Sequence, residues 1–420
     1  MHDAALAKRH RTPWDSTLAL RADPYGFISR ECRRRDVDLF ETRILLRPTT
    51  CMTGRAAAQV FYDLQRFRRS GAAPEPLRAT LFGKGGVQGL DGVPHRHRKS
   101  LFLNALSPAR LAALGARVEH DWEAAIDDWS RRTPFRLYEA VQTVLSRSVC
   151  AWAGIPLTST ELADRTRQLV LLFDGAAGGP MRHLQARAAR RSLERWLGDW
   201  IDEVRSGRID VSPACAVHVV AHHTDEHGQL LPARVAAVEL LNLLRPTIAV
   251  SVYIVFIAHA LHHHSPSRLA LRRGDDPGYI ERFVQEVRRL YPFFPAVVAR
   301  VREPFEWSGH VFPRGRRVML DLHGTNHDPR VWSAPHEFRP ERFAADPPSE
   351  YGFIPQGGAE PRGNHRCPGE DTAILLMKVA ADVLCNRMRY RVPDQDTRID
   401  MKRLPALPRD GFMIADVTAV

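Results

Sequence analysis

The chain has 420 residues, 44% of them hydrophobic and 26% charged, so it is long enough to bury a deep core without disulfide or metal staples. Its six cysteines contain no Cys-x-x-Cys pair, which excludes a disulfide framework or a zinc ribbon and indicates a reducing compartment. The net charge of +12 comes from scattered arginines, often with acids nearby, so we expect no nucleic-acid partner. Because the N-terminal residues show neither a signal-peptide pattern nor a membrane-anchor pattern, we expect a cytoplasmic protein.

Most long segments have helical periodicity, and the chain contains no repeat or linker that would mark a domain boundary. We therefore expect one mainly α domain with small β-sheets over residues 1–420. In chain order, the patterns predict a strand near residue 40, helices over 94–106, 108–130, 159–175, 181–206, 232–263 and 277–291, strands over 296–301 and 316–322, a helix over 369–388 and a C-terminal strand.

The predicted helix over 232–263 contains an unusual pair, Arg245 and Pro246. No formally charged residue occurs from Pro246 to Leu261, which indicates a buried core helix, and this run is too short to span a membrane. Pro246 predicts a bend beside Arg245. A buried arginine needs an anion, and Glu239 lies six residues earlier, nearly on another helical face. The residue pattern leaves two anions open, a distant acid or the carboxylate of a substrate.

A glycine-rich stretch, FIPQGGAEPRGNHRCPGE, ends at the start of the last predicted helix and contains Cys367. Pro368 suits a first helical position, and Arg366 adjoins the cysteine. The helix N-terminus and this arginine are expected to favour a thiolate, which is either a metal ligand or a nucleophile. A nucleophile needs a base, and His365 has no evident third partner. By residue pattern alone, a buried structural cysteine stays an equal alternative.

This stretch resembles the haem-thiolate loop of the cytochrome P450 superfamily, which implies a P450 fold with Cys367 as the fifth ligand of haem iron. Two further motifs follow the order expected for that family: EVRR, with Glu286 and Arg289, and FRPERF, with Arg342. The resemblance implies that these three side chains form a buried ion cluster behind the haem.

The sequence departs from ordinary P450 monooxygenases, and the departures resemble the fatty-acid peroxygenase branch. Arg245 and Pro246 stand where an acid and an alcohol would relay protons, and His365 replaces an arginine of the cysteine loop. Stretches such as FGKGGVQGLDGVPHRHRKSLF and VQEVRRLYPFFPAVVAR are most similar to the α-hydroxylating members. The resemblance implies hydroxylation of long-chain fatty acids at the α carbon, with the β carbon as the neighbouring alternative, by hydrogen peroxide and haem b. The substrate carboxylate, held by Arg245, would act as general acid–base.

The resemblance also assigns supporting residues, although some of them are expected to be ordinary surface charges or core aromatics. Pro246 accompanies Arg245 as a catalytic position. Gln88 matches a distal-pocket position at which decarboxylating relatives have histidine, which favours hydroxylation. The remaining positions are haem contacts at Arg69, His95, Lys99 and Gln356, and walls of the substrate-tail pocket at Phe82, Phe173 and Phe294.

Three alternative functions remain open. The first is a ferredoxin-dependent P450 monooxygenase, which the missing acid–alcohol pair disfavours. The second is a fatty-acid decarboxylating peroxygenase. The third is not an enzyme: a haem-thiolate sensor or binding protein. We expect the partners to be a long-chain fatty acid and hydrogen peroxide, without nucleic acid, membrane anchor or redox partner.

Overall fold

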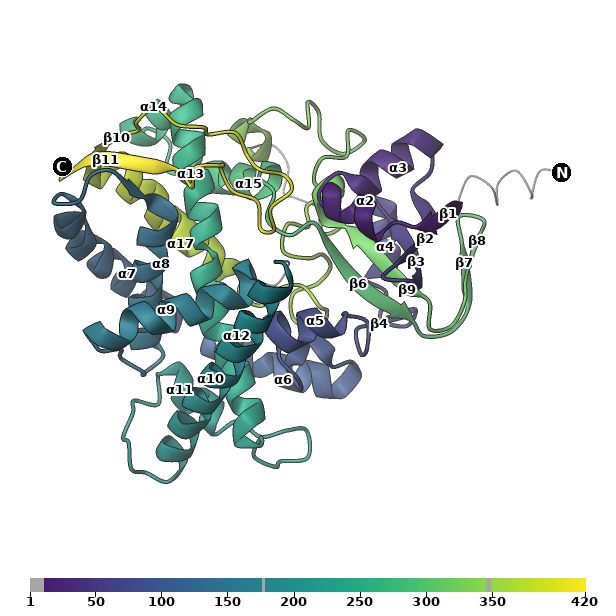
Figure 1. Cartoon of the computed structure of the whole chain (residues 1–420), viewed down its shortest axis with the longest axis horizontal. Helices are drawn as coiled ribbons and strands as arrows, with labels where there is room; N and C mark the ends of the chain where they lie inside the picture. Colours follow the sequence, from purple (N-terminus) through teal and green to yellow (C-terminus); the bar gives the residue numbers. More distant parts are fainter. Residues whose placement is uncertain (1–10, 176–177, 345–348) are drawn as a thin grey trace.

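The computed structural model describes residues 11–175, 178–344 and 349–420. Helices make up most of it, and the largest sheet lies with the N-terminal helices at one side of the molecule (Figure 1). The long helices pack together on the other side, where they enclose the largest hydrophobic core cluster. The prediction of a mainly α protein with small sheets is confirmed, whereas the assignment of residues 1–420 to a single domain stays a prediction.

The largest sheet has six strands in the order β1–β2–β3–β9–β6–β4. The central strand β9 runs parallel to β3 and antiparallel to β6, so that Val318 lies opposite both Thr50 and Ala299. β9 is thus paired along both edges, and its residues Val318 and Leu320 are fully buried. The six strands are β1 (Arg11–Asp15), β2 (Leu39–Ile44), β3 (Arg47–Met52), β4 (Phe67–Arg68), β6 (Ala296–Val301) and β9 (Arg317–Asp321).

Two smaller sheets complete the β-structure. One joins β10 (Met388–Arg391), β11 (Met413–Ala419) and β5 (Phe135–Arg136), and the other is the hairpin β7 (Phe305–Trp307) and β8 (His310–Phe312). The four strands predicted from the sequence are present as β2, β6, β9 and β11. Their alternating or apolar patterns were therefore sufficient signals.

Seven predicted helical segments are present, and the structure adds shorter helices and one long helix, α8, that the sequence analysis did not identify. Residues Val141, Thr143 and Val144 give α8 a low intrinsic helix propensity. Its apolar face nevertheless packs against α7, α9, α12 and α13, so tertiary contacts determine this element. The longer helices are α6 (Gly92–Ala105), α7 (Pro108–Trp129), α8 (Leu137–Trp152), α9 (Ser159–Asp174), α10 (Pro180–Arg205), α12 (Ala233–Ala249), α13 (Ser251–His263), α15 (Tyr279–Leu290) and α17 (Glu370–Asp382). The shorter ones are α2 (Thr17–Ala22), α3 (Phe27–Arg35), α4 (Arg55–Phe61), α5 (Glu75–Leu77), α11 (Ala216–Ala221), α14 (Ser265–Arg273) and α16 (Leu322–Thr325).

The predicted helix over 232–263 is divided into α12 and α13, which meet at Val250. Pro246 lies inside α12 and has no N–H to donate to the Asn242 carbonyl, yet the helix continues for three more residues. The combined segment Ala233–His263 is long and apolar enough to cross a membrane, with a mean hydropathy of 1.9 in its most apolar window. Because 94% of that window is buried inside the protein, the segment is a core element, and it lies at the centre of the helical side (Figure 1).

The last predicted helix starts and ends differently from the expectation of 369–388. Gly369 is the residue before α17, so Pro368 lies outside the helix and Cys367 precedes its first residue, Glu370, by three positions. After Asp382 the chain widens into the π-helical turn η4 (Val383–Arg387). The cysteine therefore belongs to a loop that leads into a helix packed against α7, α13 and α15.

Candidate active site

Backbone contacts hold the loop around Cys367. The Cys367 N–H donates to the Gln356 carbonyl at 3.1 Å, which closes the glycine-rich stretch on itself. From α6, the buried Lys99 donates its Nζ to the carbonyls of Asn364 and Arg366, the latter at 2.9 Å. The residue Cys367 is partly accessible, in contrast to the buried Cys32, Cys51, Cys150 and Cys385. This argues against the structural-cysteine alternative.

The pKa of the Cys367 thiol differs from the sequence expectation. Burial raises this pKa, and the nearby Glu370 raises it further, while the Gly369 N–H, Lys99 and Arg288 lower it; the net shift is upward. Arg366 does not serve the sulfur, because it pairs with Glu370. Desolvation therefore opposes the thiolate that the helix start was expected to favour, and a thiolate at Cys367 stays a prediction. A bound metal ion would deprotonate the thiol outright.

Arg288 is a loop-supporting residue that the sequence analysis missed. It is 1% exposed, donates Nε to Gln356 Oε1 at 3.2 Å, and forms an ion pair with Glu370. It thus joins α15 to both ends of the cysteine loop, and its charge reaches the Cys367 sulfur. The EVRR motif drew attention to the neighbouring Arg289, and Arg288, the first arginine of the same motif, was the available signal.

Basic side chains gather beside the loop, where the sequence placed the haem contacts Arg69, His95 and Lys99. The His95 ring lies against the His365 ring, with 3.9 Å between centroids. Burial, with the neighbouring His365 and Lys99, lowers the pKa of His95 to about 3, and burial lowers the pKa of Lys99 to about 8. Arg69 donates Nη1 to the Val298 carbonyl at 3.0 Å and lies over the Phe61 ring.

One carboxylate lies within this cluster. Burial opposes ionisation of Asp91, but hydrogen bonds from His365 and from the amides of Arg69 and Ser70 lower its pKa to about 2. The Asp91 carboxylate therefore already has its partners, which are the His365 ring and the backbone amides of Arg69 and Ser70. At neutral pH the two histidines are neutral, whereas Arg69 and Lys99 stay positively charged, so the cluster suits the carboxylate side chains of a haem.

The structure brings Glu286, Arg289 and Arg342 together behind α15. Arg289 contacts the Glu286 carboxylate with two nitrogens, at 2.7 and 2.8 Å, and Arg342 Nε reaches Oε1 at 3.1 Å. The remaining guanidinium donors bind backbone carbonyls between residues 326 and 337. Because Glu286 and Arg289 are fully buried, the cluster anchors this loop to α15.

Arg245 is 5% exposed on α12, and within the part of the chain that the structure describes it has no ion pair. Its Nε is buried without a hydrogen-bond partner. Burial, and then the positive charge of Arg190, lower its pKa from 12.5 to about 9. A thiolate at Cys367 would raise the pKa of the same guanidinium, so the two groups lie within electrostatic reach of each other.

Glu239, the acid considered from sequence, is engaged elsewhere. Its carboxylate pairs with Arg98 from α6 at 2.9 Å and accepts from Asn242 Nδ2 at 3.0 Å. Asn242 Nδ2 also donates to Gln88 Oε1 at 3.3 Å. Because Asn242 lies one helical turn before Arg245 on α12, Gln88 lies beside that turn. Asn242 and Arg98 were missed, because their pairing depends on packing between α6, α12 and the turn η2 (Val87–Gly89).

The three predicted tail-pocket phenylalanines lie in three separate parts of the chain. Phe82 ends the π-helical turn η1 (Arg78–Phe82), Phe173 is buried in α9, and both pack against the same core cluster. Phe294 precedes β6, is 39% exposed and contacts Phe293, which itself lies against Tyr253 of α13. Phe293 is thus the member of this pair that contacts the core helix.

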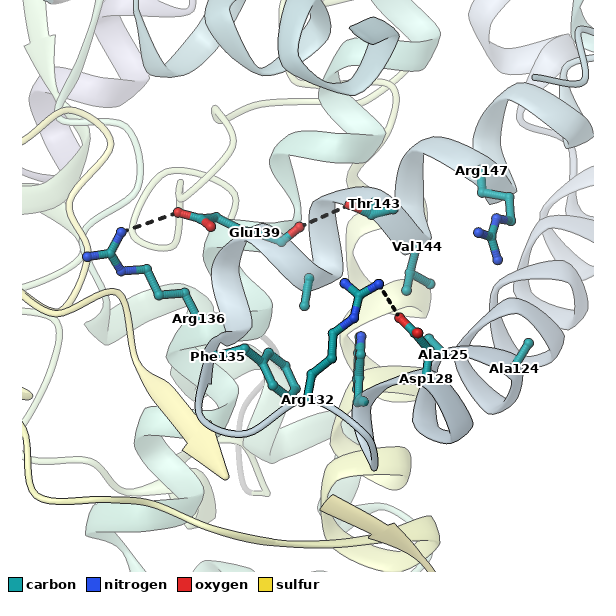
Figure 2. Close-up of a pocket in the computed structure, with 12 residues that line it drawn as sticks. Ala124, Ala125, Asp128, Arg132, Phe135, Arg136, Glu139, Thr143, Val144 and Arg147 are labelled. Carbon is teal, nitrogen blue, oxygen red and sulfur yellow. Dashed lines mark hydrogen bonds and ion pairs between the residues drawn. The ribbon is translucent and has the colours of Figure 1, made fainter. Parts of the chain in front are cut away.

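Figure 2 shows a pocket that does not belong to this site. It has a volume of about 280 Å³ and is formed by α7, β5 and α8, with the ion pairs Arg132–Asp128 and Arg136–Glu139 at its edge. None of the predicted site residues lines it. The pocket is therefore separate from the candidate active site.

The residues present fit a haem. Cys367 offers a soft sulfur ligand on a loop braced by Lys99 and Arg288, the basic cluster can receive carboxylates, and Arg245 is buried without an anion. A cytochrome P450 family model matches residues 275–414, a range that contains Glu286, Arg289, Arg342 and Cys367.

Comparisons with known proteins extend the likeness to the whole chain. The solved structure of cytochrome P450SP alpha (CYP152B1) in complex with (R)-ibuprophen is 50% identical, with a TM-score of 0.94, over 96% of this chain and 99% of that one. Cytochrome P450EX alpha (CYP152N1) with myristic acid is 38% identical, with a TM-score of 0.94, over 98% and 99% of the two chains. Cytochrome P450 137 of Mycobacterium tuberculosis is 22% identical over 80% of this chain and 74% of its own length. The chain therefore belongs to the cytochrome P450 family, in its fatty-acid peroxygenase branch, and is a haem-thiolate enzyme with the P450 fold.

Proposed function

We propose that this enzyme hydroxylates long-chain fatty acids at the α carbon with hydrogen peroxide, using haem b. The observation that carries the proposal is Arg245, a buried guanidinium without an anionic partner among the described residues. A free buried charge is costly, and a carboxylate that accepts both prongs of the guanidinium removes the cost. The related structures that hold myristic acid and ibuprophen support this choice, because both ligands are carboxylic acids.

Cys367 would bind the haem iron through its sulfur, with Gln356, Lys99 and Arg288 bracing the loop. When bound, the haem supplies the oxidising chemistry that inserts one oxygen of peroxide into a C–H bond. Arg69, His95 and Lys99 would contact its carboxylates. Pro246 would help by interrupting the hydrogen bonding of α12 next to Arg245.

Among the described residues no carboxylate pairs with Arg245, and Glu239 is committed to Arg98 and Asn242. The substrate carboxylate, held by Arg245, would therefore act as general acid–base. It would accept a proton from one oxygen of hydrogen peroxide and return it to the other, which leaves as water. One oxygen of the peroxide becomes the hydroxyl group of the fatty acid, and the other leaves in water. Because peroxide is itself the oxidant, the reaction needs no electron donor and no redox partner.

The position of Arg245 also accounts for the expected regiochemistry. With the carboxylate anchored there, only the first carbons of the chain can approach the reacting oxygen. Phe82, Phe173 and Phe294 would border the tail. Gln88 is a neutral amide oriented by Asn242 and cannot hold or release a proton as histidine does, so it favours hydroxylation over decarboxylation.

The test uses purified haem-loaded protein, hexadecanoic acid and isotope-labelled hydrogen peroxide, without any reductase. We expect mainly 2-hydroxy acid that carries the label, and loss of most turnover in Arg245→Ala, by ~10²- to 10⁴-fold, as for removal of a general acid–base. Mainly 3-hydroxy acid would correct the position but keep the mechanism. Mid-chain alcohol or terminal alkene would contradict the anchored carboxylate or the role of Gln88. Turnover that requires ferredoxin and its reductase would replace the proposal with a monooxygenase.

A further inference from the structure

A second buried guanidinium, Arg190 of α10, lies near Arg245 and was not singled out by any sequence motif. It is 3% exposed, and its Nε pairs with Glu194 Oε1 at 2.7 Å. Its two terminal nitrogens donate to three consecutive backbone carbonyls of one segment: Thr80 at 3.2 Å, Leu81 at 3.4 Å and Phe82 at 3.4 Å. A single side chain therefore binds the whole end of the turn η1.

These carbonyls are the ones that a helical turn leaves without partners at its C-terminal end. A cation at that end satisfies them and interacts favourably with the partial negative charge there. The chain then turns away at Gly83, which has a φ of +84°. A Cβ at this position would collide with Nη2 of Arg190 and would lie 2.7 Å from Val238 Cγ1. The end of η1 is thus held tightly between α10 and α12.

The segment that Arg190 holds leads directly to the candidate active site. Gly86 packs against the Phe82 carbonyl, Asn242 Nδ2 and Gln88 Oε1, each 3.1 Å from the position of a Cβ. Asn242 lies one helical turn before Arg245 on α12. Arg190 also acts on Arg245 through its charge, since it is the second cause of the lowered pKa of Arg245.

We propose that Arg190 is a positioning residue that determines substrate specificity, because it fixes the backbone of residues 80–82, from which the chain leads through Gly86 to Gln88 and the turn of α12 before Arg245. Phe82 would then form a fixed wall of the pocket that holds the substrate tail, and small shifts of this wall would change which carbon lies nearest the oxidant. The second positive charge would also favour a carboxylate at Arg245. This inference rests on the proposed function, since it concerns how that site holds a fatty acid.

Two variants of the holoenzyme test the proposal. Arg190→Lys keeps the charge and can keep Glu194, but one ammonium group cannot reach three carbonyls in a fixed fork. The double variant Arg190→Met with Glu194→Gln removes both charges together, so that no unpaired carboxylate remains to unfold the protein. The matched control is Arg187→Lys, one turn earlier on α10, where Arg187 pairs with Glu75 near the molecular surface.

In Arg190→Lys we expect amide hydrogen exchange over residues 78–90 to quicken roughly tenfold, as for loss of a hydrogen bond to a charged group. We also expect the product to become a mixture of 2- and 3-hydroxy acids, and KM to depend more weakly on chain length. The double variant should show both changes and weaker binding of hexadecanoate by calorimetry, whereas Arg187→Lys should match the wild type.

If amide hydrogen exchange over residues 78–90 quickens in the Arg190 variants but the products and KM stay unchanged, Arg190 has only a structural role, and the proposal is overturned. Unchanged exchange in both Arg190 variants would overturn it as well. If the wild type forms no hydroxy acid with peroxide, the proposed function fails separately. Exchange over 78–90 together with calorimetric binding of the acid still decides whether Arg190 positions the site.

Discussion

Replacing Arg245 by methionine should stabilise the ligand-free enzyme while destroying its ability to bind fatty acid. Folding buries the Arg245 guanidinium near Arg190 and without an ion pair among the described residues, and burial, then the Arg190 charge, lower its pKa from 12.5 to about 9. Each pKa unit corresponds to about 1.36 kcal/mol, so the charge opposes folding by up to ~5 kcal/mol. Replacing buried ionic groups by apolar residues of similar volume commonly gains about 1–4 kcal/mol, and we expect Arg245→Met to fall in that range.

The measurement is urea-induced unfolding of the haem-loaded wild type and Arg245→Met, with and without hexadecanoic acid. Without the acid, the variant should unfold at the higher urea concentration with an unchanged slope. With the acid at a hundred times its dissociation constant, the wild type should gain about 2.7 kcal/mol and the variant almost nothing. Arg187→Met, from a partly exposed ion pair, should change neither quantity by more than a few tenths of a kcal/mol.

The same pair of proteins has a defined pH dependence. For a base whose pKa is lower in the folded state, the unfavourable contribution is fully present below the folded pKa, near 9, and disappears as pH rises toward 12.5. The stability advantage of Arg245→Met should therefore be constant from pH 7 to about 9 and shrink above it. The reasoning is refuted if the variant is less stable than the wild type at pH 7, or if both gain equally from the fatty acid.

The remaining predictions concern the metal ligand, the ion cluster and a buried histidine. Cys367→Ser should lose the red-shifted ferrous carbon monoxide absorption band of a thiolate-bound haem, and retention of that band would mean that another residue binds the iron. Arg289→Met should lower the free energy of unfolding by about 3–5 kcal/mol, because it leaves the buried Glu286 with a single arginine; a loss below 1 kcal/mol in urea unfolding would contradict the anchoring role. Burial lowers the pKa of His259 to about 3, so the wild type should lose stability relative to His259→Gln as pH falls below 6.5, by about 1.36 kcal/mol per pH unit. Parallel pH–stability curves for these two proteins would show that His259 does not titrate as described.

The sequence alone determined the main class and much of the framework. Helices and strands with strong periodicity, such as α10, α15 and β9, were predicted nearly to their ends, because their signals are local. The cysteine loop and the EVRR and FRPERF motifs identified the family for a related reason, since each is a contiguous pattern whose order along the chain carries the information. An arginine beside a proline in an apolar helix also marked the candidate site without any coordinates.

Only the tertiary structure decided which charges are paired and how burial acts on them. Glu239 is unavailable to Arg245 because Arg98, 141 residues earlier, reaches it from α6. Burial raises the pKa of Cys367 against the nearby helix start, and Arg288, Asn242 and Arg190 gain their roles from elements distant in sequence. Ion pairing and desolvation depend on the whole packed interior, so no local pattern predicts them.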